Sequence, residues 1–397
     1  MKLVRFLMVL IVICGVVLRL LVFDKAGGDY LTYKKAMNSF RAGINPYVET
    51  VTSFKLTGVE HGYAYLPTLL YTQYTVWLLG NFIGSPVSTI FTWKIPVLLA
   101  DFALLYFIIK KFRSTQTLAE AILQLTVVAF WTFNPYLIAR YDYSLYDPLF
   151  LFLILLALER VETKPIASGI FYVLAVSLKT IPLILFPLFL IKSPNKVKFV
   201  LACIFVFVLI SIPFMRSSYD FSTYIQGALL VHGEREVQGR PFLSIISFYL
   251  QDYGVNFMQQ NFVNGYAFLA LFASLALPPL LYFTKKLKDK YSWVTLSFFV
   301  YLLLTPVLNR THLLWILPWL LIVIYVNVVS VKKQIFATCL LIVLWLFSFF
   351  YLFTWGNGLK VKTKENNMVL VLESSDDEWE FSRVLRQKYY EFRGKLL

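Results

Sequence analysis

The chain has 397 residues, of which 59% are hydrophobic and only 15% are charged, and its mean hydropathy is +0.68. Soluble domains carry about a quarter charged residues, so this composition excludes a soluble fold. The net charge of +15 comes from Lys and Arg in short runs beside apolar segments. Such runs are typical of membrane topology signals, and they argue against nucleic-acid binding.

The apolar segments are about long enough to cross a hydrocarbon core of roughly 30 Å, and basic clusters that should face the cytoplasm separate them. The first segment has no small-residue cleavage site after it, which favours a retained first helix. We therefore expect an all-α, polytopic transmembrane bundle with about eleven crossings. In chain order these are 5–23, 88–109, 118–138, 145–159, 166–178, 181–191, 198–215, 264–284, 291–308, 312–329 and 333–354.

The alternation of sides predicts two large external loops, 24–87 and 216–263. Within the first loop, the Tyr- and Trp-containing segment 66–80 is expected to be an interfacial helix. The transmembrane module is thus 1–355, followed by a charged tail, 356–397. Ser375 and the acids that follow it predict a short capped helix in this tail.

Ionisable residues that are not topology signals gather on the external side of this arrangement. Buried or membrane-depth charges are costly, so a one-sided group of them indicates a functional site. The group consists of Asp29, Arg41, Glu60, His61, Arg140, Asp142, Asp147, Lys179, Arg235, Arg240, Arg310 and His312.

Asp29 follows Gly27-Gly28 just after the first crossing. A carboxylate near the bilayer surface suits a general base that accepts a proton from a hydroxyl group. The alternative is an N-cap for an amphipathic helix over 30–42, and both roles can hold together.

Lys179 lies between two apolar pieces shorter than a full span and is followed by Thr-Ile-Pro182. A cation there needs an anion, and a lipid phosphate is a natural partner, although the side chain could also extend to the headgroups. Arg310 and His312, in an external turn, could bind phosphate or transfer protons, or His312 could be an ordinary turn residue.

The segment from Arg140 to Asp147 mixes charges with tyrosines at an external helix end. It could belong to a site or to an interfacial aromatic belt. The three cysteines lie in apolar stretches without metal-ligand spacing, and they predict neither a disulfide nor a metal site. Sequence motifs of P-loop ATPases, zinc proteases and serine hydrolases are missing from the chain.

Several short motifs follow one another along the chain in the order in which a known family carries them. They are Asp29-Tyr30, Gly43-Ile-Asn-Pro46-Tyr47, Tyr63-Ala-Tyr65-Leu-Pro67, Trp93-Lys94-Ile-Pro96 with Asp101, Phe133-Asn134-Pro135, Leu178-Lys179-Thr-Ile-Pro182, and Asn309 to Trp315. Together they resemble the GT-C superfamily of polyprenyl-phosphate-sugar-dependent glycosyltransferases. The resemblance is to the mannosyltransferase branch, with the first GPI-anchor mannosyltransferase and the bacterial phosphatidylinositol-mannoside enzymes.

The resemblance implies a hexosyltransferase, with mannose as the expected sugar, that moves it from a polyprenyl or dolichyl phosphate to a glycolipid or glycan acceptor with inversion. Asp29 would be the catalytic base. The donor phosphate would be bound by Lys179, Arg310, His312 and Arg140. The sugar or acceptor would contact Tyr30, Tyr63, Tyr65, His61, Asp142 and Asp147.

The first loop resembles that of the GPI-anchor mannosyltransferase, which carries an Asp-x-Asp pair, whereas this chain has Gly27-Gly28-Asp29 at that place. We therefore predict no metal-ligating residues and no required cofactor. A divalent metal ion as cofactor is the alternative. The expected location is a bacterial or archaeal plasma membrane, or the ER membrane in a eukaryote. A transporter or flippase of lipid-linked or anionic solutes is the alternative function, and a scaffold without activity is a third.

Overall fold

The computed structural model describes most of the chain. The described residues are 2–23, 27–54, 62–82, 89–142, 146–231, 238–239, 241–242, 260–287, 289–353, 358–364 and 367–373. Helices dominate, so the predicted all-α membrane fold is confirmed. The chain divides into two compact units, Val17–Phe107 with Arg140–Arg235, and Met1–Val16 with Ile108–Ala139 and Glu236–Leu397.

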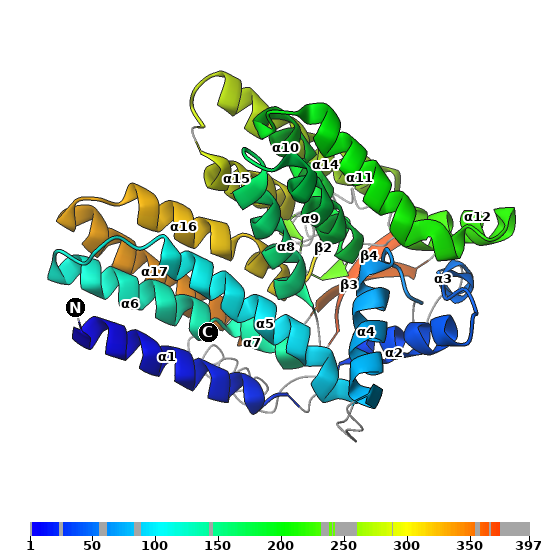
Figure 1. Cartoon of the computed structure of the whole chain (residues 1–397), viewed down its shortest axis with the longest axis horizontal. Helices are drawn as coiled ribbons and strands as arrows, with labels where there is room; N and C mark the ends of the chain where they lie inside the picture. Colours follow the sequence, from blue (N-terminus) through cyan, green and yellow to red (C-terminus); the bar gives the residue numbers. More distant parts are fainter. Residues whose placement is uncertain are drawn as a thin grey trace. The chain divides into compact units, whose positions relative to one another are not determined.

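The unit that contains the loop predicted to be external, 24–87, is built from short helices and longer apolar ones. It contains α2 (Gly28–Arg41), α3 (Tyr47–Ser53), α4 (Thr68–Phe82), α8 (Asp147–Arg160), α9 (Pro165–Leu178), η1 (Ile181–Leu185), α10 (Phe186–Lys192), α11 (Lys196–Ser211), η2 (Ile212–Phe214) and α12 (Ser218–Ala228). Helix α9 packs against both α8 and α11, as the ribbon shows (Figure 1). Three further helices have residues in both units: α1 (Lys2–Leu20), α5 (Thr89–Lys110) and α7 (Pro135–Asp142).

The other unit contains the later apolar helices. Its elements are α6 (Leu118–Thr132), β1 (Gln238–Gly239), α14 (Gln260–Phe283), α15 (Lys290–Leu304), β2 (Val307–Leu308), η4 (Arg310–Trp315), α16 (Leu317–Asn327), α17 (Val331–Phe353), β3 (Gly358–Lys364) and β4 (Asn367–Glu373). Helix α14 packs on α15, and α17 packs on α6.

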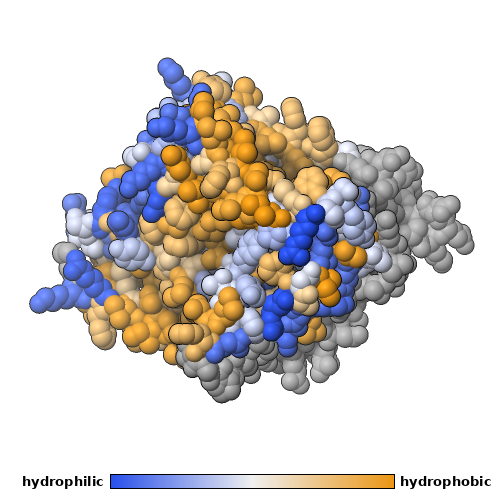
Figure 2. Space-filling model, turned by 45° about the vertical axis from the view of Figure 1, so that its right-hand side comes forward, coloured by the Kyte–Doolittle hydropathy of each residue, from blue (hydrophilic) through white to orange (hydrophobic). Residues whose placement is uncertain are grey.

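Each predicted crossing coincides with helical structure, and five helical segments are long and apolar enough to span a membrane. They are Lys2–Leu20, Leu118–Ala139, Lys196–Phe214, Gly265–Phe283 and Val331–Phe349. Helices α1, α11 and α17 expose many large apolar side chains, and broad hydrophobic areas cover the surface (Figure 2). Such faces need lipid around them, so the protein is an integral membrane protein. The number of crossings and their orientation stay predictions.

The predicted interfacial segment forms α4, a helix of 15 residues, and α4 is not among the helices long enough to span. The break at Lys179 is also present. Lys179 has extended backbone angles, φ −152° and ψ 129°, directly after α9. Pro182 explains the stop, because its ring would clash with the carbonyl of Leu178 if α9 continued.

The tail contains two strands that were not predicted. Strands β3 and β4 pair antiparallel between residues 358 and 373. The sequence alternates Leu359, Val361 and Thr363 with lysines, which is the two-residue period of a strand. The helix expected after Ser375 lies outside the described residues. A second, shorter ladder pairs β1 with β2 in parallel.

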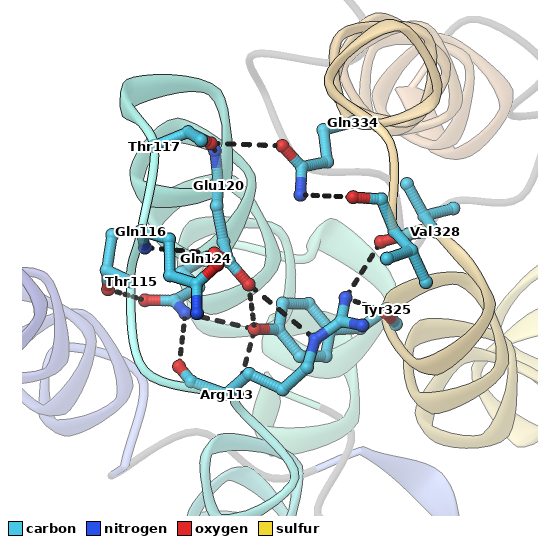
Figure 3. Close-up of polar contacts among 10 residues, drawn as sticks. Arg113, Thr115, Gln116, Thr117, Glu120, Gln124, Tyr325, Val328 and Gln334 are labelled. Carbon is cyan, nitrogen blue, oxygen red and sulfur yellow. Dashed lines mark hydrogen bonds and ion pairs between the residues drawn. The ribbon is translucent and has the colours of Figure 1, made fainter.

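A polar network ties α6 to α16 within the second of these units. Figure 3 shows Glu120, Gln124 and Arg113 converging on the Tyr325 hydroxyl. This hydroxyl accepts from the Arg113 backbone N–H and from Gln124 Nε2, each at 3.0 Å, and donates to Glu120 Oε1 at 3.3 Å. Arg113 also forms an ion pair with Glu120 at 3.6 Å. Each polar group that converges here has a partner, so the network fixes the helix ends.

Candidate active site

A group of aromatic rings surrounds Tyr33 in the unit formed by Val17–Phe107 and Arg140–Arg235. We call it the tyrosine cluster, and it consists of Tyr30, Tyr33, Tyr63, Tyr65, Trp93 and Tyr146. The Tyr33 ring stacks on Trp93 with 5.8 Å between centroids. It meets Tyr65 at 5.9 Å and Tyr146 at 5.6 Å, both edge-on. The cluster therefore gathers residues from α2, the segment before α4, α5 and the start of α8.

Side-chain hydrogen bonds hold the non-helical segment that carries Tyr63 and Tyr65, because its backbone groups lack helical partners. Thr50 Oγ1 donates to the Tyr63 carbonyl at 2.8 Å, and Tyr47 Oη donates to the Tyr65 carbonyl at 2.7 Å. Gly62 allows this packing, since a Cβ there would lie 2.7 Å from Thr50 Cα. Helix α3 thus supports the wall of the cluster.

Asp29 lies in the first turn of α2, next to the cluster, and it is exposed. The expectation that Asp29 could be the N-cap is wrong, because Gly27 occupies that position with extended angles and without a side-chain cap. Asp29 is one turn before Tyr33, so both lie on the same side of the helix. An exposed carboxylate here remains accessible to an incoming substrate.

The electrostatics of Tyr33 connect the two carboxylates of this region. Burial is the main cause that raises the pKa of Tyr33 well above its ordinary value of 10.0, followed by Tyr65 and the charge of Asp29. Asp147 contributes in the same direction. The Tyr33 hydroxyl therefore stays protonated at neutral pH, and both Asp29 and Asp147 lie within electrostatic range of it.

Lys179 forms an ion pair with the carboxylate of Asp147, the first residue of α8. Lys179 Nζ lies 2.9 Å from Asp147 Oδ1, and the side chains are 17% and 2% exposed, respectively. The Asp147 carboxylate orients Lys179, whose ammonium group carries three donors and retains some exposure. The sugar contact predicted for Asp147 stays a prediction. The anion expected beside Lys179 is present, but it belongs to the protein.

His312 has a local structural role in the other unit. Its Nδ1 accepts the backbone N–H of Asn309 at 3.3 Å in a capping box, and its ring stacks on Trp315 with 4.2 Å between centroids. Because Nδ1 is an acceptor, Nε2 carries the proton in the neutral ring. Arg310 and His312 belong to a different compact unit from Lys179, so their grouping around one phosphate stays a prediction.

Three predicted site residues cannot be placed by their side chains. His61 lies outside the described residues. Arg140 and Asp142 lie in α7, and at these two positions the structure describes the backbone only. Within the described part of the chain, no three His, Cys, Asp or Glu side chains gather as metal ligands would.

The structure also brings together residues that the sequence did not assign to the site. Arg19 of α1 and Asp101 of α5 form an ion pair at 2.5 Å with both side chains 0% exposed. Single charges in two apolar segments were the available signal, since each needs a partner. Tyr33 was also missed, although it follows Asp29 by four residues in a helix, whereas Tyr146 lies in the segment from Arg140 to Asp147 that was considered for the site.

Comparison with known proteins gives a partial match. Residues 63–253 match glycosyltransferase family 87. No curated protein is significantly similar to the chain. The matched stretch includes Tyr63, Tyr65, Asp147 and Lys179, whereas Asp29 and His312 lie outside it. Together with the apolar helices, the match indicates a membrane glycosyltransferase.

Proposed function

We propose that this protein transfers a hexose, mannose, from a polyprenyl or dolichyl phosphate to a hydroxyl group of a lipid-linked or glycan acceptor on the external face of the membrane. The observation that carries the proposal is one group of contacts within or beside the family-matched segment. There, an exposed carboxylate, Asp29, and an ion pair between the partly exposed Lys179 and the buried Asp147 flank one tyrosine cluster.

The reaction is a direct displacement with inversion. The acceptor oxygen forms a bond to the anomeric carbon while the bond from that carbon to the phosphate oxygen breaks. The hydroxyl proton goes to the Asp29 carboxylate, and the polyprenyl phosphate leaves with the electron pair. Asp29 suits this step, because it is exposed and lies beside protonated hydroxyl groups that can orient an acceptor.

Lys179 stabilises the charge that develops on the leaving phosphate, and Asp147 positions it. Asp147 accepts a hydrogen bond from the Lys179 ammonium group and holds the side chain in place, and the 17% of that side chain that stays exposed is where a phosphate oxygen can approach. Arg140, which belongs to the same compact unit as Lys179, is a further proposed contact to the phosphate. The phosphate-binding roles of Arg310 and His312 stay predictions from the sequence.

The sugar and the acceptor bind against the tyrosine cluster. Tyr65 is half-buried and offers its ring and hydroxyl directly, whereas Tyr30 and Tyr63 are 3% and 2% exposed and act by positioning their neighbours. Aromatic rings with hydroxyl groups suit the mixed apolar and polar surface of a sugar. His61 and Asp142 are further proposed contacts from the adjoining segments.

The location and topology belong to the same proposal. Basic clusters such as Lys110 to Arg113 mark the cytoplasmic side, and Asp29 and Lys179 then lie toward the external side. The membrane is proposed to be a bacterial or archaeal plasma membrane, with the ER membrane as the eukaryotic counterpart.

The experiment is a transfer assay with purified protein in lipid nanodiscs, radiolabelled polyprenyl-phosphate mannose and a panel of glycolipid acceptors. We expect label to move from the donor to an acceptor with inverted anomeric configuration. Movement of intact donor across vesicle membranes without cleavage would instead identify a flippase. Transfer of another sugar but not mannose would correct the donor and keep the reaction class.

A further inference from the structure

A small pocket beside the tyrosine cluster is lined by two buried side chains whose polar atoms lack hydrogen-bond partners within the described part of the chain. Gln73 of α4 and Tyr146, which precedes α8, line it together with Trp93. Gln73 is 4% exposed and Tyr146 is 3% exposed. Neither amide atom of Gln73 nor the Tyr146 hydroxyl has a hydrogen-bond partner among the residues that the structure describes.

Such an arrangement is unfavourable unless something occupies the pocket. A buried donor or acceptor that loses its hydrogen bond to water and gains none in the protein destabilises the fold, and three polar atoms are affected here. The remaining lining is apolar, including Leu69, Val97 and Leu149. The space holds about one water-sized group, so the occupant is small, neutral and able both to donate and to accept hydrogen bonds.

The position of the pocket indicates which group that is. The Tyr146 ring lies 5.6 Å from the rings of Tyr33 and Tyr65, and Tyr146 directly precedes Asp147, the partner of Lys179. Trp93 stacks on Tyr33. The pocket therefore adjoins the surface proposed to bind the sugar.

We infer that Gln73 and Tyr146 form a specificity subsite that binds a single hydroxyl group of the transferred sugar. The inference rests on the proposed function. The Gln73 carbonyl oxygen accepts the sugar hydroxyl proton, and the Gln73 amide or the Tyr146 hydroxyl donates to its oxygen. A sugar without this hydroxyl leaves the subsite unsatisfied and is rejected, because paired polar groups discriminate strongly against an analogue that lacks one of them. A buried water is the other source of the same chemistry.

The test uses five donors, polyprenyl-phosphate mannose and its 2-, 3-, 4- and 6-deoxy analogues, with the wild-type protein, Gln73→Leu and Tyr146→Phe. Wild type should discriminate against one analogue by about 100-fold in kcat/KM. Gln73→Leu should lower transfer of mannose by about 10- to 100-fold and leave that analogue nearly unchanged, so the discrimination disappears. Tyr146→Phe should reduce the discrimination at the same position of the sugar.

The matched control is Gln226→Leu, the same substitution on an exposed face of α12, and it should keep the wild-type donor preference. If Gln73→Leu lowers the rate for all five donors by one factor, the pocket holds water only and the inference is wrong. Donor binding, measured without acceptor, separates the two claims. If the protein binds the donors with discrimination but transfers no sugar, the proposed reaction alone is wrong. If it neither binds nor transfers any mannose donor, both the proposed donor and the subsite are wrong.

Discussion

Two polar regions of this protein differ in how completely their buried groups are paired. Around Tyr325, the hydroxyl binds Gln124, Glu120 and the Arg113 backbone, and Glu120 also meets Arg113 (Figure 3). Around Gln73, both amide atoms and the neighbouring Tyr146 hydroxyl lack partners among the described residues. A complete network stabilises the fold by itself, whereas an incomplete one stores a binding capacity that a ligand can use. Substitutions should therefore affect stability in the first region and substrate selection in the second.

The largest effect is expected at the Arg19–Asp101 ion pair, because both side chains are fully buried. Asp101→Ala leaves the Arg19 guanidinium without its carboxylate and should lower the free energy of unfolding by about 3–5 kcal/mol. Thermal unfolding in detergent checks this, with Asp101→Asn as the variant of similar shape. A loss below about 1 kcal/mol would show that the pair does not hold α1 against α5.

A similar loss is expected for Lys179→Met, because it leaves the Asp147 carboxylate buried and uncompensated. The double variant Lys179→Met with Asp147→Asn removes both charges and should regain most of the lost stability. Transfer should stay lost in the double variant if Lys179 binds the donor phosphate. Recovery of both stability and transfer would assign Lys179 a structural role only.

An intermediate effect is expected in the complete network. Tyr325→Phe removes a hydroxyl that binds Gln124, Glu120 and a backbone N–H, and it should destabilise the protein by about 1–3 kcal/mol. The preference among donors should not change, since the network lies outside the proposed substrate surface. If Tyr325→Phe changed the donor preference but left the stability normal, the network around Tyr325 would act in substrate selection, and the contrast with the Gln73 region would be wrong.

The smallest effect on stability is expected for Gln73→Leu without substrate. Leucine replaces an unsatisfied amide by an apolar group of similar size, so the free energy of unfolding should change by less than about 1 kcal/mol, or rise. The stabilisation that bound donor gives to wild type should decrease in the variant. A large loss of stability in Gln73→Leu without donor would indicate that Gln73 is already paired in the free protein.

Much of the fold could be predicted from the sequence, because the length of an apolar segment and the basic clusters between segments are direct physical signals. The break after Leu178 was also predictable, since Pro182 stops a helix locally. Strands β3 and β4 were not predicted, because their alternation is short and lies within a charged tail.

The site was predictable only in part. That Lys179 needs an anion follows from its apolar surroundings, but the identity of the partner does not, because Asp147 reaches it through the packing of α8 on α9. The role of Asp29 as an N-cap failed because Gly27, two residues earlier, already adopts the extended cap conformation. Gln73 gave no sequence signal, since a glutamine in a helix is ordinary and only its burial without a partner marks it.

The most direct test of the central claim is the single-turnover rate of mannose transfer by Asp29→Asn at saturating donor. The account predicts a fall of about 10²-fold or more with donor affinity near wild type, because the base acts in the chemical step. Glu49→Gln is the matched control, since Glu49 is also an exposed acid in the first turn of an external helix, α3, and should transfer normally. A rate for Asp29→Asn within about threefold of wild type would contradict the assignment of Asp29 as the catalytic base.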